Sequence, residues 1–222
     1  PMDFRLASRS LASLAALCAS LTVSSVEAAK CPNVQFVLDR SGSMGTTVPG
    51  AGPGATRWSV AKAAINKVVD KWDGQFPIGI SIFPPTGGSG CGSDLVTPPA
   101  YGTKAKIKMA IDANGPSGGT PSGSAMRDAQ MIKELRDPER KQYVVLITDG
   151  GPGCSGEPDT CNGTAGQIRN AFMASPSIAT FVVGFGGGLS ASEAQCMTQM
   201  ADAGGKPAMT PEKYYKADND VE

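Results

Sequence analysis

The chain has 222 residues, 41% of them hydrophobic, which is enough to bury one sizeable core and too few for two large domains. Its 20 basic and 20 acidic residues give a formal net charge of zero, so no global field attracts nucleic acid or an anionic membrane. We therefore expect one domain that binds no nucleic acid and recognises its partner through a local site.

Residues 1–29 differ in character from the rest of the chain. Arg5 and Arg9 precede a small-residue, apolar stretch over residues 11–26, a pattern typical of a secretory signal peptide. A helix of the domain would have a polar face, and a transmembrane anchor would have a longer apolar run, so both alternatives are disfavoured. We expect export to the extracellular space, the cell surface or the periplasm, no stable membrane insertion after signal cleavage, and a mature domain over residues 30–222.

Four largely apolar runs, rich in Val and Ile, are predicted to be strands buried on both faces of a parallel sheet. They lie at residues 34–38, 78–83, 143–148 and 178–183. Residues 94–97 are predicted to form one short antiparallel edge strand, and residues 213–216 a final strand.

Helical patterns separate these runs. Apolar residues recur at helical spacing over residues 61–72 and 125–135. A third helix is predicted to begin at Ser190, which forms an S-x-x-E capping box with Glu193, and to end at Gly204. The alternation of strands and helices predicts an α/β fold with a doubly wound, mostly parallel central sheet flanked by helices.

Five cysteines follow the predicted signal, and export makes disulfides their expected state. They are Cys31, Cys91, Cys154, Cys161 and Cys196. An odd number leaves one thiol free, bonded to another chain, or bonded to a residue outside this sequence. We favour closure of Cys154 with Cys161 around a short loop, and pairing of Cys91 with either of them is the alternative. A zinc site is disfavoured because the chain has no His and no C-x-x-C motif.

Oxygen-bearing side chains follow two of the predicted strands. Asp39, Ser41 and Ser43 come directly after the first run, and Asp149 follows the third. Thr120 lies between them in the sequence, in a Gly-Gly-Thr-Pro turn before a helix. Because parallel strands end at a common edge, where open α/β sheets bind ligands, these five side chains are expected to converge.

The set contains two carboxylates and three hydroxyls and neither His nor Cys. Such a hard, oxygen-only environment favours Mg²⁺, with Mn²⁺ or Ca²⁺ as alternatives, over zinc or copper. Because hydroxyls are neutral ligands, the ion would keep residual positive charge, and a carboxylate from another molecule would be a favourable further ligand. The residues therefore predict a metal site that bridges to an acidic residue of a protein partner.

The D-x-S-x-S segment, the Gly-Gly-Thr-Pro turn and the T-D-G segment together resemble the metal-ion-dependent adhesion site (MIDAS) of von Willebrand factor A (vWA) domains. The segments LDRSGSMG and LITDG most resemble those of bacterial exported members of that family. The resemblance covers nearly all of the chain after the predicted signal, and it implies a Rossmann-like vWA fold with adhesion-type protein binding. It also implies that Ser41 and Ser43 ligate the metal directly and that Thr120 does so in the ligand-ready state. Asp39 and Asp149 would act mainly through water.

Two other classes of function fit the sequence less well. The absence of His removes the usual Ser-His-Asp and Cys-His arrangements of hydrolases. Phosphotransferases with an Asp nucleophile want a second acid two residues later, where this chain has Ser41 after Asp39. We therefore expect no enzymatic activity and keep a metal-dependent hydrolase or phosphotransferase only as an alternative. A structural scaffold module without metal-bridged binding is the other alternative.

Segments around the candidate site carry further expectations. Arg40 is expected to be solvated, and partner specificity is expected to reside in the loops at residues 46–55, 87–99 and 151–163. The resemblance also implies a long C-terminal helix after the last strand. Because the chain stops at Glu222, that helix is predicted to be truncated or absent.

Overall fold

A computed structural model describes residues 30–87, 91–185 and 189–217. The predicted signal peptide at residues 1–29 lies outside the described residues, as do residues 218–222, to which the prediction of a truncated C-terminal helix applies. Within the described ranges, no helix is both long and apolar enough to span a membrane.

Helices separate most of the strands along the chain, in line with the predicted α/β pattern. The strands are β1 (Lys30–Asp39), β2 (Ile78–Phe83), β3 (Asp94–Ala100), β4 (Arg140–Thr148), β5 (Ile178–Gly184) and β6 (Tyr215–Lys216). The α-helices are α1 (Arg57–Trp72), α2 (Lys104–Ala113), α3 (Ser122–Ala129), α4 (Cys161–Met173) and α5 (Ala191–Ala203). Two short 3-10 helices are η1 (Gly42–Gly45) and η2 (Lys133–Arg136).

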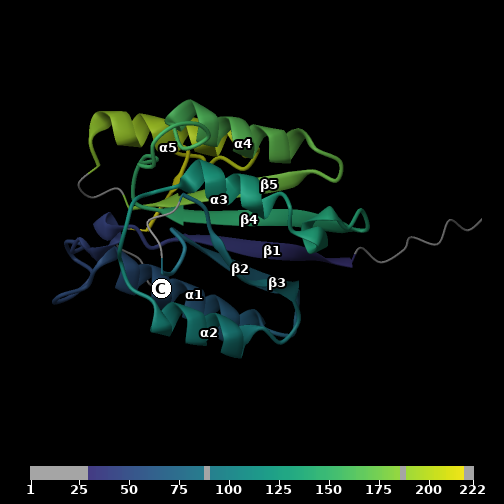
Figure 1. The fold of residues 1–222 in the computed structure, drawn as a ribbon. Helices are drawn as coiled ribbons and strands as arrows, with labels where there is room; N and C mark the ends of the chain where they lie inside the picture. Colours follow the sequence, from purple (N-terminus) through teal and green to yellow (C-terminus); the bar gives the residue numbers. More distant parts are fainter. Residues whose placement is uncertain (1–29, 88–90, 186–188, 218–222) are drawn as a thin grey trace, which may run out of the picture.

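The strands form one sheet in the order β3-β2-β1-β4-β5-β6 (Figure 1). β3 pairs antiparallel with β2, and all other neighbours pair in parallel. The predicted mostly parallel sheet and its antiparallel edge strand are thus confirmed, while the final strand is shorter than predicted. Every residue of β2 is buried, as expected of a strand covered on both faces.

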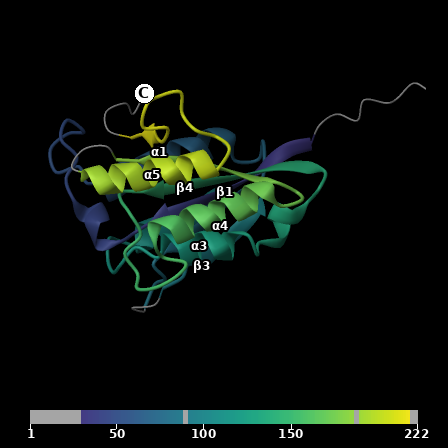
Figure 2. The ribbon, with the colours of Figure 1, turned by 90° about the horizontal axis from the view of Figure 1, so that it is seen from above.

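Helices cover both faces of the sheet, as Figures 1 and 2 show. On one face, Ile65 of α1 and Ile107 of α2 share a buried cluster with Leu38 of β1. On the other face, Met126 of α3 and Ile168 of α4 belong to a second buried cluster, which also includes residues of α5. The central strands contribute to both clusters because successive side chains of a strand point to opposite faces.

Three of the helices, α1, α4 and α5, begin at residues whose side chains cap them. Thr56 caps α1 through a capping box. Ser190 and Glu193 form the predicted capping box at the start of α5. The Thr160 hydroxyl caps α4 by accepting a backbone N–H hydrogen bond at 3.0 Å. These caps satisfy N–H groups that the first turn of a helix leaves without a partner.

The predicted helix over residues 125–135 is wrong in its second half. α3 ends at Ala129, and the next N–H groups bond to carbonyls three residues back, as in 3-10 turns. The Arg136 Nε donates to the Gln130 carbonyl at 2.8 Å and so satisfies an acceptor at the end of the helix. Ile132 is still buried in the cluster beneath α3, so the apolar spacing is retained although the α-helix is not.

α2 and α4 are helices that the sequence analysis did not predict. α2 buries only Ile107 and Ile111, and lysines surround them, so its apolar periodicity is weak. α4 contains Gly163 and Gly166, which lower intrinsic helix propensity. Both helices form because packing on the sheet, more than local propensity, stabilises helices in proteins.

The favoured disulfide, Cys154 with Cys161, is wrong. The structure pairs Cys91 with Cys154 and Cys161 with Cys196, and Cys31 is an exposed free thiol. The reason is that Cys161 is the first residue of α4 and lies against α5, whereas Cys154 lies in the loop after β4, which meets the loop after β2. The alternative pairing of Cys91 with Cys154 is therefore confirmed.

Candidate metal site

The candidate site lies where the adjacent parallel strands β1 and β4 end. Asp39 is the last residue of β1, and Asp149 directly follows β4. The chain continues from β1 to α1 on one face of the sheet and from β4 to α4 on the other (Figure 1). This divergence is the topological switch point at which open α/β sheets bind ligands.

Hydrogen bonds join four of the five predicted site residues. The Ser41 N–H donates to Asp39 Oδ1 at 2.7 Å. The Ser41 and Ser43 hydroxyl oxygens are 3.0 Å apart, and the Ser43 hydroxyl donates to Asp149 Oδ1 at 2.8 Å. The 3-10 helix η1 curls this loop over the end of β1. The structure thus brings together the two carboxylates and two hydroxyls that the sequence analysis selected.

Thr120 reaches the same edge through backbone contacts. The Gly118 carbonyl accepts a hydrogen bond from the Gly42 N–H at 3.0 Å, and the Thr120 carbonyl accepts one from the Gly153 N–H at 2.9 Å. Gly118 has a φ of 81°, and a side chain there would also press against Pro84, so glycine is required. The turn that contains Thr120 is therefore held between the loop after β1 and the loop after β4.

Asp39 is fully buried, with an exposed fraction of 0%. Burial is the main reason that the pKa of its carboxyl group is raised to about 7. The hydrogen bond from the Thr148 hydroxyl, at 2.6 Å, lowers this pKa, and the nearby Asp149 carboxylate raises it. A negative charge at this position is therefore costly unless a cation lies beside it.

Arg57 is a site residue that the sequence analysis missed. Its Nη1 lies 2.8 Å from Asp149 Oδ2, and the two side chains are 8% and 1% exposed. Arg57 is the first residue of α1, a position where the helix dipole disfavours positive charge. The sequence analysis had no signal for this role, because the helix it predicted covers residues 61–72 and leaves Arg57 outside.

Arg40 is buried, which corrects the expectation that it is solvated. Its Nε donates to the Pro84 carbonyl at 2.9 Å, and its two Nη atoms donate to the Gly115 and Pro85 carbonyls, each at 3.0 Å. The physical reason is that these carbonyls, in two separate loops, need donors where water is excluded. Arg40 therefore fixes the loops beneath the site and does not face a partner.

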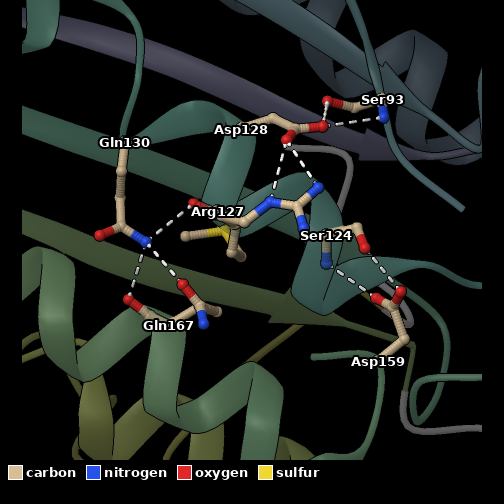
Figure 3. Close-up of polar contacts among 8 residues, drawn as sticks. Ser93, Ser124, Arg127, Asp128, Gln130, Asp159 and Gln167 are labelled. Carbon is tan, nitrogen blue, oxygen red and sulfur yellow. Dashed lines mark hydrogen bonds and ion pairs between the residues drawn. The ribbon is translucent and has the colours of Figure 1, made fainter. Parts of the chain in front are cut away.

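Helix α3 is joined to its surroundings by polar contacts at both ends (Figure 3). At its start, the Ser124 N–H and hydroxyl donate to the Asp159 carboxylate at 2.8 and 2.7 Å. Towards its end, Asp128 accepts from the Ser93 N–H and hydroxyl, both at 3.3 Å. Gln130 connects the end of the helix to α4. The loops after β2 and β4, which the Cys91–Cys154 disulfide also joins, are thus attached to α3.

The fold and this site define a doubly wound α/β domain whose candidate ligand site lies at the carboxyl edge of the sheet. The family model for the von Willebrand factor type A domain matches residues 34–152, which is more than half of the chain. The chain therefore belongs to the von Willebrand factor type A domain family.

Known proteins with similar sequence or fold include bacterial and animal examples. The uncharacterized protein YwmC of Bacillus subtilis (strain 168) is 27% identical over 139 residues, which span 59% of this chain and 60% of YwmC. The pilus adhesin SpaC from Lactobacillus rhamnosus GG is 17% identical with a TM-score of 0.64, over 87% of this chain and 29% of SpaC. Proximal thread matrix protein 1 from the mussel byssus is 18% identical with a TM-score of 0.56, over 86% of this chain and 42% of that protein. The chain thus spans less than two thirds of each relative, and at these identities the solved structures show the fold alone.

Proposed function

We propose that this vWA domain binds a protein partner through a divalent cation, with Mg²⁺ preferred, held by a MIDAS. Its residues are Asp39, Ser41, Ser43, Thr120 and Asp149. The observation that carries the proposal is the hydrogen-bonded chain from Asp39 through the two serines to Asp149, at the edge where such sheets bind ligands. The turn that contains Thr120 lies against the same loops, so all five side chains come from one edge of the sheet.

The spacing of the oxygen atoms fits a small octahedral ion. Two ligands at right angles around Mg²⁺, at its usual bond length of about 2.1 Å, are about 3.0 Å apart. The Ser41 and Ser43 hydroxyl oxygens, both proposed as direct ligands, are 3.0 Å apart. These oxygens therefore already have the separation of neighbouring ligands of such an ion.

The contacts of the two carboxylates give them a supporting role. Asp39 accepts hydrogen bonds from a backbone N–H and the Thr148 hydroxyl, and Asp149 from a serine hydroxyl and the Arg57 guanidinium. Each carboxylate thus has both oxygens engaged with protein donors, which supports the mainly water-mediated role that the family resemblance implies for them. The resemblance assigns direct ligation to Ser41 and Ser43, and to Thr120 in the ligand-ready state. The mussel byssus protein is a precedent within this fold, since one of its structures has a zinc-occupied MIDAS motif.

The charges of the site favour an acidic partner. Asp39 and Asp149 bring negative charge, and the Arg57 guanidinium already neutralises Asp149. A divalent cation would therefore leave the occupied site with net positive charge. An acidic side chain of the partner neutralises that charge as a further oxygen ligand. Protein binding also agrees with the names of the structural relatives, a pilus adhesin and a thread matrix protein.

Export and the absence of catalysis belong to the same proposal. The two disulfides are expected of a protein in an oxidising environment, which supports an extracellular, cell-surface or periplasmic location. The sequence contains no His, and the buried Asp149 engages both oxygens with neighbouring donors, which argues against a general base at this site. Binding is therefore favoured over hydrolysis or phosphoryl transfer.

Isothermal titration calorimetry with MgCl₂ tests the metal site. We expect the wild-type protein to bind Mg²⁺, and Ser43→Ala and Thr120→Ala each to weaken binding, because each removes a ligand oxygen. Ser175→Ala is the matched control, since this exposed serine lies just before β5, at the opposite edge of the sheet. Wild-type affinity in Ser43→Ala would contradict the proposed ligand set.

A pull-down from the envelope or culture medium of the host organism tests the partner. We expect the captured protein to be released by EDTA and not to be captured by Asp39→Asn, whose circular dichroism spectrum should match that of the wild type. Capture that survives both the chelator and the substitution would favour the scaffold alternative.

A further inference from the structure

Helix α3 begins immediately after the turn that contains Thr120, yet its own sequence supplies no cap. Pro121 stands at the N-cap position and makes no side-chain hydrogen bond to the helix. Proline lacks the side-chain oxygen with which Ser, Thr, Asn or Asp satisfy the first N–H groups of a helix. The start of α3 therefore needs an acceptor from another part of the chain.

Asp159 is that acceptor. Asp159 is buried, with an exposed fraction of 4%. One of its carboxylate oxygens accepts a hydrogen bond from the Ser124 N–H at 2.8 Å, and the other accepts one from the Ser124 hydroxyl at 2.7 Å (Figure 3). Its negative charge also lies at the positive end of the helix dipole. Asp159 belongs to the loop after β4, the same loop that begins with Asp149.

A second observation places this loop directly on the turn that contains Thr120. The Gly153 N–H donates to the Thr120 carbonyl at 2.9 Å. A side chain at Gly123 would overlap the Pro158 carbonyl oxygen, and a Cβ at Gly119 would lie 3.2 Å from the Gly153 carbonyl oxygen. Backbone therefore packs on backbone at the start of α3, and glycines make this close approach sterically feasible.

We infer that Asp159 is a positioning residue for Thr120. By holding the first turn of α3 against the loop after β4, it fixes the position of Thr120 relative to that loop and to Asp149. The loop carries Asp149 at its start, holds Thr120 through Gly153, and holds Ser124 of α3 through Asp159, so two site residues from different loops keep a fixed separation. This inference rests on the proposed metal-binding function and adds to it.

Calorimetric titration of Asp159→Asn with MgCl₂ tests the inference. Asparagine keeps one acceptor oxygen and replaces the other with a donor, so half of the contact with Ser124 is lost. We expect Mg²⁺ affinity to fall about tenfold or more, as is typical for residues that orient metal ligands. Ser124→Ala, which removes only the hydroxyl bond, should show a smaller loss and serves if Asp159→Asn does not fold.

Asp128→Asn is the matched control. Asp128 also accepts from the N–H and hydroxyl of one serine, Ser93, but it lies towards the other end of α3, away from Thr120. We expect this variant to keep wild-type Mg²⁺ affinity. Equal losses in Asp128→Asn and Asp159→Asn would overturn the positioning role, because they would reflect a general loosening of α3.

A double-mutant cycle with Thr120→Ala separates positioning from a loss of stability. If Asp159 acts through Thr120, Asp159→Asn changes Mg²⁺ affinity no further in the Thr120→Ala background. The same loss in both backgrounds, or wild-type affinity in Asp159→Asn, would overturn the inference. A wild-type protein that takes up no Mg²⁺ would instead overturn the proposed function, so the two failures are distinguishable.

Discussion

Replacing Arg57 with methionine separates the stability of the candidate site from its affinity for metal. Arg57→Met removes the positive charge that lies 2.8 Å from Asp149 and keeps a long, apolar side chain in the same buried space. The Asp149 carboxylate is then buried without a cation. We expect two opposite effects: the metal-free protein becomes less stable, and its affinity for Mg²⁺ rises.

The size of the stability loss follows from the geometry of the ion pair. Unit charges separated by 2.8 Å attract by about 6 kcal/mol at an effective dielectric constant of about 20. The two side chains are 8% and 1% exposed, so solvent screens this attraction little. Desolvation offsets part of it, and removal of one partner of a buried pair typically costs about 3–5 kcal/mol. We therefore expect the free energy of unfolding to fall by about 3 kcal/mol or more.

The gain in metal affinity comes from removing the repulsion between the positive charge of Arg57 and a bound divalent ion. Even at the dielectric constant of water, about 80, a unit positive charge about 6 Å from a divalent ion is repelled by about 1.4 kcal/mol. Removing that repulsion raises the affinity about tenfold. The effect is larger where the site excludes water.

Urea unfolding in EDTA measures the first effect, and calorimetric titration with MgCl₂ measures the second. Arg57→Lys keeps the positive charge and is the control, for which we expect a smaller loss of stability and no gain in affinity. Two results would refute the reasoning: a variant as stable as the wild type in EDTA, or one that binds Mg²⁺ more weakly than the wild type.

Three further predictions concern other parts of the structure. Burial in the folded protein raises the pKa of Asp39 to about 7, so the folded protein keeps a proton that the unfolded chain releases above about pH 4. The free energy of unfolding of the metal-free protein is therefore expected to fall by on the order of 4 kcal/mol as the pH rises from about 4 to about 7. Urea unfolding in EDTA should show a smaller loss over this range for Asp39→Asn. Gly123→Ala should lower the melting temperature and the free energy of unfolding by about 1–3 kcal/mol, because its Cβ would overlap a backbone carbonyl. Gly166→Ala should instead stabilise α4 by about 0.5–1 kcal/mol, because a Cβ there would have no other atom within 4 Å. Replacing both Cys91 and Cys154 with serine should cost about 4 kcal/mol, because the disulfide joins residues 63 positions apart; an unchanged denaturation midpoint would contradict this.

The convergence of the candidate site residues could be predicted because its signals are local. β1 and β4 contain largely apolar runs at residues 34–38 and 143–148, and Asp39 and Asp149 directly follow them. Parallel strands end at the same edge, so the chain direction alone places these carboxylates together. Ser41 and Ser43 follow within the same short loop, and their approach to Asp149 needed no further information.

The contacts that stabilise the site could not be predicted because they join residues far apart in the chain. Arg57 and Asp149 are 92 positions apart, and no periodic pattern relates them. The Cys91–Cys154 disulfide likewise depends on how two Gly-rich loops meet in space, whereas the favoured pairing considered only closeness in sequence. Propensity also failed where packing decides, as in α4, whose two glycines disfavour an isolated helix.

If the site binds a divalent cation and an acidic partner as proposed, its charges predict that the two bind cooperatively. Arg57 neutralises Asp149, and below about pH 7 a proton neutralises Asp39. If the proposed site holds Mg²⁺, Asp39 would have to be deprotonated while the Arg57–Asp149 ion pair stays in place, and the occupied site would keep net positive charge. A carboxylate that neutralises this charge must stabilise the bound cation by the same free energy by which the cation stabilises the bound carboxylate.

This coupling is measurable without knowledge of the partner. Acetate supplies a single carboxylate, and we expect a saturating concentration to raise the affinity for Mg²⁺ about tenfold, a coupling of about 1.4 kcal/mol, relative to chloride at equal ionic strength. Calorimetric titrations, with free Mg²⁺ corrected for its association with acetate, provide the comparison. Arg57→Met should show weaker coupling, because its occupied site has less positive charge for acetate to neutralise. If acetate leaves the Mg²⁺ affinity of the wild type unchanged, residual charge is not what attracts an acidic partner, and the partner must be recognised through the surrounding loops.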